Sequence, residues 1–190
     1  MKVYFMANNK ILYDSKFLQL KSTKAKNGHD WFYAHRPNAK NVVVILPIIK
    51  NSQILFTIEE RPPLGAEKIG KYSIAIPAGL VGDVRKDESV EDAIKTELLE
   101  EAGLIADKIE IVADKVASSP GCVSEICTIA IAYISEYNQV AEPLSDGGII
   151  IDRELVSIDN IYSWLKQKEQ DGYILTGQTL AALFYLQERT

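Results

Sequence analysis

Apolar residues along the chain fall into short runs that predict strands. The longest run, residues 42–49, is apolar throughout and includes Pro47, and a continuous run of this length is typical of a buried strand. Polar residues at 50–52 join it to the next run, which predicts a hairpin. The other predicted strands are residues 2–6, 11–20, 53–59, 72–76, 109–117, 126–134 and 149–156.

Segments with helical spacing lie between and after these strands, and they predict helices at 89–102, 159–169 and 178–188. Strands and helices are interspersed without regular alternation. This pattern favours an α+β fold, an α/β/α sandwich in which helices cover a mixed β-sheet. We expect the main domain at residues 41–190, preceded by a β-rich arm at residues 1–40.

The first predicted helix has clear signals at both ends. Ser89 is placed to cap its N-terminus, with Asp92 three residues later in the capping-box position. Gly103 is suited to the left-handed backbone conformation that often ends a helix. These signals predict a helix with sharply defined ends.

Three glutamates interrupt the apolar face of this helix. At about 100° per residue, Glu97 and Glu101 fall inside the apolar stripe and Glu100 lies at its edge. The stripe is defined by Val90, Ala93 and Ile94. Burying an unpaired carboxylate costs on the order of several kcal/mol unless a cation compensates its charge. The pattern therefore predicts a face that looks into a cleft and holds a divalent metal ion.

The charge distribution supports this interpretation. The chain has 26 acidic and 21 basic residues, a net charge of −5. Residues 88–101 alone contain six acids and one base, Lys95, so this segment has the same net charge as the whole chain. The acidity is thus local. A solvated acidic helix without metal is the alternative that stays open.

Composition excludes several other classes of protein. No apolar run approaches the roughly 20 residues needed to cross a bilayer, so we expect no membrane partner and a cytoplasmic location. The two cysteines, Cys122 and Cys127, are too few for a disulfide framework and form a poor zinc motif. A slightly acidic chain without a basic cluster argues against nucleic-acid binding.

The acidic helix and the residues before it resemble the signature of the Nudix hydrolases. These are metal-dependent enzymes that cleave nucleoside diphosphates linked to another moiety. The matching pattern is Gly82-x5-Glu88-x7-Thr96-Glu97-Leu98-x-Glu100-Glu101-x-Gly103-Leu104. Thr96 stands where the family has an arginine that helps orient the acidic side chains. Gly82 fits the family's spacing, but Gly79 lies in a Pro-Ala-Gly-Leu phrase typical of one subfamily, and we favour Gly79 as the equivalent glycine.

Within this family, the chain is similar to the ADP-ribose pyrophosphatases. Pro120 lies 16 residues after Leu104, as does that group's diagnostic proline. Similar phrases are Ser119-Pro120-Gly121-Cys122-Val123-Ser124-Glu125, Glu60-Arg61-Pro62 and Gly177-Gln178-Thr179-Leu180. The resemblance covers about residues 41–190. It also implies a homodimer built partly from the arm.

The resemblance implies a site for Mg²⁺, with Mn²⁺ as a substitute. Glu97 and Glu101 would converge on one ion, Glu100 would reach a second, and the backbone carbonyl of Ala78 would complete a site. Magnesium prefers oxygen ligands, which this set supplies, in a near-octahedral geometry that usually keeps several waters.

The same resemblance implies a set of substrate-binding residues. Arg61, in a segment whose prolines predict a loop, would hold phosphate, and Glu125 would hold a ribose hydroxyl. Leu80, Ser119 and Gly121 complete the set. An exposed loop charge for Arg61 and a surface acid for Glu125 are the alternatives.

The function implied is magnesium-dependent hydrolysis of the pyrophosphate bond of ADP-ribose, giving AMP and ribose 5-phosphate. The general base stays open: Asp146, Glu142, Glu100, or water activated by the metal alone. A second hypothesis is another nucleoside diphosphate derivative, such as a nucleotide sugar or a dinucleotide coenzyme. A third is a ligand-binding module of the same fold with weak catalysis, because Thr96 replaces the family's arginine.

Overall fold

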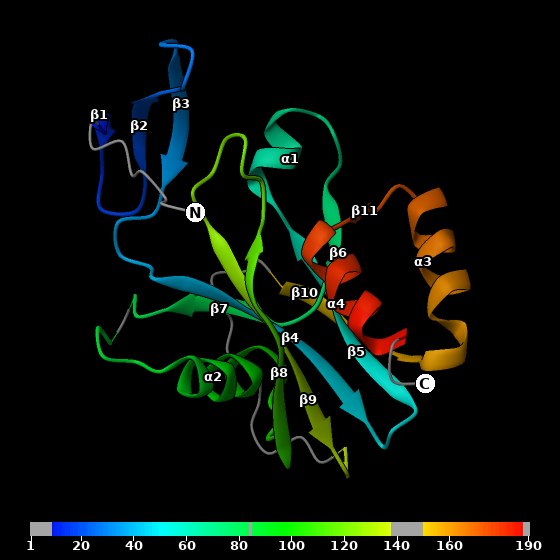
Figure 1. Ribbon diagram of the computed structural model, residues 1–190. Coiled ribbons are helices and arrows are strands. Elements are labelled where there is room, and N and C mark those ends of the chain that lie inside the picture. Colours follow the sequence, from blue (N-terminus) through cyan, green and yellow to red (C-terminus); the bar gives the residue numbers. More distant parts are fainter. Residues whose placement is uncertain (1–8, 84, 138–149, 188–190) are drawn as a thin grey trace.

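The computed structural model describes residues 9–83, 85–137 and 150–187. The chain forms a three-stranded arm and a larger body built on an eight-stranded mixed sheet (Figure 1). The expected strand at residues 2–6 lies outside the described residues. The α+β prediction is confirmed.

The arm is an antiparallel sheet of β1 (Lys10–Asp14), β2 (Gln19–Lys24) and β3 (Asp30–His35). The prediction of one strand over residues 11–20 was wrong. The chain turns back instead between Ser15 and Leu18, where the Ser15 hydroxyl both accepts from the Leu18 N–H and donates to the Leu18 carbonyl. A serine that satisfies the backbone of the same turn favours a turn over a continuous strand.

The body has a central strand, β4, whose neighbours run in both directions. It is parallel to β9 and antiparallel to β5 and β7. The strand order is β11-β6-β5-β4-β9-β8, with β10 paired to β5 and β7 to β4. The strands are β4 (Asn41–Ile49), β5 (Gln53–Glu60), β6 (Tyr72–Ala75), β7 (Ala78–Val81), β8 (Lys108–Ala117), β9 (Ile126–Ile134), β10 (Ile150–Ser157) and β11 (Ile174–Leu175).

Helices cover both faces of this sheet, as the sandwich prediction requires. One face packs against α2 (Val90–Ala102), and the other against α3 (Ile161–Gln170) and α4 (Gly177–Gln187) (Figure 1). A short 3₁₀ turn, Ile158–Asn160, precedes α3. Alternating side chains of β4 enter the two apolar cores, because successive residues of a strand point to opposite faces.

One local prediction next to the site was wrong. The expected loop at residues 61–65 contains a short helix, α1 (Pro62–Ala66). Prolines are tolerated there because the first helical positions need no N–H donor. The strand predicted at residues 72–76 ends at Ala75, before Pro77 as expected, but Ala78 begins a further strand, β7, that was not predicted and that pairs with the first half of β4.

The arm is held against the turn between β8 and β9. The Ala34 N–H donates to the Cys122 carbonyl over 2.8 Å, and the Ser124 N–H donates to the Ala34 carbonyl over 3.0 Å. Figure 1 shows this turn reaching up beside β3. The Ser-Pro-Gly phrase of the sequence therefore joins the arm to the body.

Candidate metal and substrate site

The helix that carries the candidate metal ligands has the ends that the sequence predicts. The Ser89 hydroxyl accepts a hydrogen bond of 3.0 Å from the Asp92 N–H. Gly103 follows the last helical residue with φ 68°, and its N–H donates to the Leu99 carbonyl over 2.9 Å. A helix capped at both ends presents its side chains at fixed heights above the sheet.

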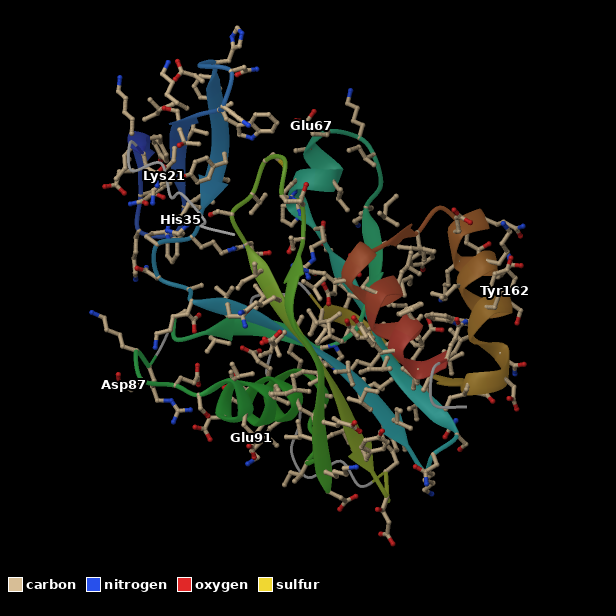
Figure 2. The ribbon with its side chains drawn as sticks, in the orientation of Figure 1. Lys21, His35, Glu67, Asp87, Glu91 and Tyr162 are labelled. Atoms are coloured by element: carbon tan, nitrogen blue, oxygen red, sulfur yellow. The ribbon has the colours of Figure 1, made fainter. Side chains whose placement is uncertain are left out.

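Acids lie on two different sides of α2. Ile94 and Leu98 are fully buried against the sheet, and Glu97 and Glu101 are half-buried beside them. Glu91 lies on the outer side, where Figure 2 shows it pointing away from the sheet. The two half-buried glutamates therefore border the apolar core, as the interrupted stripe predicts.

Glu101 and Glu97 both reach the start of β7. The Glu101 carboxylate accepts a hydrogen bond of 2.9 Å from the Ala78 N–H. A Cβ added at Gly79 would lie 1.8 Å from both Cδ and Oε1 of Glu97, which is far inside van der Waals contact. The side chain of Glu97 therefore occupies the space that only a glycine leaves open.

Gly82 has a separate structural role. Its φ is 83°, in the left-handed region that favours glycine, and its N–H donates to the Glu88 carboxylate over 3.1 Å. The Arg85 guanidinium lies 3.0 Å from the other oxygen of Glu88. Gly79 is the glycine in contact with the helix that carries the candidate metal ligands, and Gly82 with Glu88 closes the loop that leads into that helix.

Two buried polar residues, Glu59 and Ser73, lie on the sheet face that α2 covers. Glu59 is buried near the end of β5, where its carboxylate accepts from the Thr57 hydroxyl over 2.7 Å and pairs with the Arg61 guanidinium. Ser73, directly across from Glu59 on β6, is fully buried. Arg61 itself is partly exposed at the start of α1. A buried carboxylate paired with this arginine holds one positive charge at the end of β5.

A second arginine approaches the helix from β10. Arg153 donates from Nε to the backbone carbonyl of Glu101. The pairing of β10 with β5 places Arg153 opposite Thr57. Sequence reasoning missed Glu59 and Arg153, although each was visible as a charged residue inside a predicted strand.

The residues at the start of β7 fit a divalent cation in part. Two carboxylates on consecutive turns of α2 approach Ala78 and Gly79, and carboxylate oxygens are the ligands that magnesium prefers. Glu100 is exposed on the same helix. Within the described ranges, no group of three carboxylate, imidazole or thiolate side chains lies close enough to form a complete metal site. Glu97 and Glu101 would thus need backbone oxygens, water or substrate to complete the coordination.

Two of the remaining predicted residues, Ser119 and Gly121, lie at the turn between β8 and β9, next to the arm. The Gly121 carbonyl accepts from the Trp31 indole over 2.8 Å, and the Ser119 carbonyl accepts from the Cys122 N–H. Leu80 is on β7 and half-buried against the core.

Glu125 has protein partners for both carboxylate oxygens. One oxygen accepts from the Arg36 guanidinium over 2.9 Å, and the other accepts from the Ser118 hydroxyl over 3.1 Å. A ribose hydroxyl that binds Glu125 would donate to an oxygen that already accepts from Arg36 or Ser118. Of the candidates for a general base, Glu142 and Asp146 lie outside the described residues.

None of the helices in the described ranges combines the length and apolarity that crossing a membrane requires.

No family model matches the sequence, and no curated protein matches it. Among solved structures, the chain is similar to the crystal structure of an ADP compounds hydrolase, with a TM-score of 0.66 and 21% sequence identity. The match covers 96% of this chain and 91% of that chain. At this identity the likeness concerns the fold, which is the mixed-sheet α+β architecture expected from the sequence.

Proposed function

We propose that the protein is a magnesium-dependent hydrolase of nucleoside diphosphate compounds, and that its substrate is ADP-ribose. The observation that carries this proposal is the meeting of Glu97 and Glu101 with Ala78 and Gly79 at the start of β7. In a helix whose acids are only solvated, these two carboxylates would not be directed at the sheet. The similar solved structure, that of an ADP compounds hydrolase, supports the same substrate class.

Different residues of the chain would bind the metal and the substrate. Glu97 and Glu101 would hold the metal, with the Ala78 carbonyl and Glu100 as further ligands, and Mn²⁺ would substitute for Mg²⁺. When bound, the metal would neutralise the pyrophosphate oxygens and acidify water. Arg61, held by Glu59 at the end of β5, would bind a phosphate oxygen. The turn with Ser119, Gly121 and Glu125 would lie along the nucleoside.

One observation bears on which diphosphate compound is the substrate. Because both oxygens of Glu125 already accept from Arg36 and Ser118, the ribose contact that the resemblance implies is not preformed. Another diphosphate compound, such as a nucleotide sugar or a dinucleotide coenzyme, is therefore the second candidate. In both versions the bond cleaved is the pyrophosphate.

A substrate panel assayed with and without Mg²⁺ tests these readings. The proposal predicts Mg²⁺-dependent release of AMP and ribose 5-phosphate from ADP-ribose, with kcat/KM well above the values for nucleotide sugars and dinucleotides. An equal or reversed preference would move the assignment to the second substrate group. Metal-independent binding without turnover of any compound would reject hydrolysis and favour a ligand-binding module.

We also propose that the arm pairs with a second copy of the chain. The small sheet leaves its large apolar side chains exposed: Ile11, Leu12, Tyr13, Phe17, Leu18, Leu20, Trp31 and Phe32. Such a collection is typical of an interaction surface. Phe17, 72% exposed, is the most accessible of them.

Sedimentation velocity of charge substitutions tests the dimer. Phe17→Glu should convert a dimer to a monomer, whereas Ile105→Glu, at a residue that is also exposed but lies outside the arm, should leave the dimer intact. A monomeric parent protein, or a dimer that survives Phe17→Glu, would remove the arm from the interface.

A further inference from the structure

The last two turns of α2 concentrate negative charge. Glu97, Glu100 and Glu101 lie there, and the last turn contains no basic residue. The helix dipole places a further partial negative charge at the same end, where cations are favourable and anions are not. An isolated helix with this sequence would be unstable at its C-terminal end, which is the end that carries the candidate metal ligands.

Arg153 brings the missing positive charge from another element. It lies on β10, half-buried, and its Nε donates to the Glu101 carbonyl. That carbonyl belongs to the last helical turn, where backbone oxygens have no partner within the helix. The contact joins residues separated by 52 positions in the sequence and ties the end of α2 to the sheet.

We propose that Arg153 is the positioning residue of the metal site: its bond to the Glu101 carbonyl fixes the main chain whose side chain would bind the cation. This inference rests on the proposed function, because it assigns a purpose to the position of Glu101. Two contacts hold Glu101, one at its main chain and one at its side chain. Arg153 binds its backbone, and the Ala78 N–H binds its carboxylate.

The sign of the change in metal affinity separates positioning from simple electrostatics. Removing a positive charge near a cation site should, by Coulomb's law alone, make the cation bind more tightly. Losing the bond that positions a ligand should make it bind more weakly, by about 10–100-fold for partners that orient metal ligands. A purely structural role at the helix end would lower the melting temperature without weakening the binding of metal to the folded protein.

The experiment is a titration of the full chain with Mn²⁺, with free Mn²⁺ measured by electron paramagnetic resonance. Arg153→Met removes the donor and the charge, and we expect its Kd for Mn²⁺ to rise at least about tenfold. Arg153→Lys keeps the charge and one donor, and we expect a smaller rise of about threefold. The matched control is Lys95→Met, which removes one positive charge from the outer face of the same helix, where Lys95 pairs with Glu91. Its Kd should stay the same or fall slightly.

Glu101→Gln separates failure of this inference from failure of the proposed function. If Glu101→Gln weakens Mn²⁺ binding while Arg153→Met leaves it equal or tighter, the metal site stands and the role of Arg153 is rejected. If Glu101→Gln also leaves binding unchanged, the metal site itself is rejected. Should Arg153→Met fail to fold, the Lys variant decides, and an unchanged Kd there rejects the role of Arg153.

Discussion

The Glu97 side chain fills the space beside Gly79 that the Cβ of any other residue would need. A Cβ built on Gly79 would lie 1.8 Å from Cδ of Glu97. The two residues are 18 positions apart and lie on different elements, α2 and β7. The contact explains why a glycine follows Ala78, and it fixes where the Glu97 carboxylate can be. Changing either residue should therefore affect the site more than the fold.

Gly79→Ala should strongly reduce metal-dependent turnover while leaving stability nearly intact. The methyl group would meet the flexible end of the Glu97 side chain, which can swing aside at little cost to the backbone. We expect kcat/KM to fall at least about tenfold, as for other changes that displace a metal ligand, and the free energy of unfolding to change by less than about 1 kcal/mol. Steady-state kinetics and urea unfolding measure the two quantities.

Gly82→Ala is the matched control for that substitution. Because Gly82 has a positive φ of 83°, alanine there is strained, at a cost of about 1 kcal/mol or more. Its nearest neighbours are the flexible Lys40 side chain and a loop carbonyl, and none of them is an acid of α2. We expect lower stability with turnover retained. If Gly82→Ala lost turnover and Gly79→Ala kept it, the glycine that the site requires would be Gly82, and our assignment of Gly79 would be wrong.

Glu101→Gln should abolish most of the metal-dependent rate in a folded protein. The amide keeps the size of the side chain and can still accept from the Ala78 N–H, but it lacks the negative charge that a divalent cation requires. Glu91→Gln removes the same charge from the outer face of α2, where Glu91 pairs with the exposed Lys95, and should leave the rate within about twofold because surface ion pairs contribute little. Near-normal turnover in Glu101→Gln would contradict the ligand role.

His35 should make the contact between arm and body weaken in acid. Its Nδ1 lies 2.9 Å from the Ser124 hydroxyl, and Figure 2 shows it at the base of the arm. Desolvation by burial, followed by the nearby charge of Lys21, lowers the pKa of His35 below its ordinary value of 6.5. The docked arm therefore prefers the neutral imidazole, and the undocked or unfolded state binds more protons at mildly acidic pH.

The sign follows from that difference in proton binding. The contribution of His35 is fully present above pH 6.5 and is lost as the pH falls through the lowered pKa. Hydrogen exchange of the Trp31 indole N–H, which donates to the Gly121 carbonyl, reports on the contact after correction for intrinsic rates. Protection should fall at acidic pH in the parent and change less in His35→Gln. The same pH profile in both proteins would show that His35 is not the group that titrates.

The parts of the structure that the sequence predicts are those with local causes. Ser89 and Gly103 define the ends of α2 through hydrogen bonds within a few residues. The strand at 126–134 is predicted from its apolar run, and in the structure this run is buried almost throughout. The inward position of Glu97 and Glu101 follows from helical periodicity alone, since 3.6 residues per turn place both on the side of the buried stripe.

The parts that sequence reasoning missed depend on distant partners. The strand β7 exists because it pairs with β4, which nothing in Ala78-Gly79-Leu80-Val81 announces. Arg153 meets Glu101 only after β10 has paired with β5. Glu125 looked available for substrate because its partner Arg36 comes from the end of the arm, 89 residues earlier. Pairings across such distances carry no signal in a single sequence.

Anomalous diffraction from a crystal soaked in Mn²⁺ tests the central claim most directly. We predict a peak between the carboxylates of Glu97 and Glu101 beside Ala78, with metal–oxygen distances near the roughly 2.1 Å typical of such small divalent cations. No peak there, with the two side chains turned apart into bulk solvent, would contradict the account.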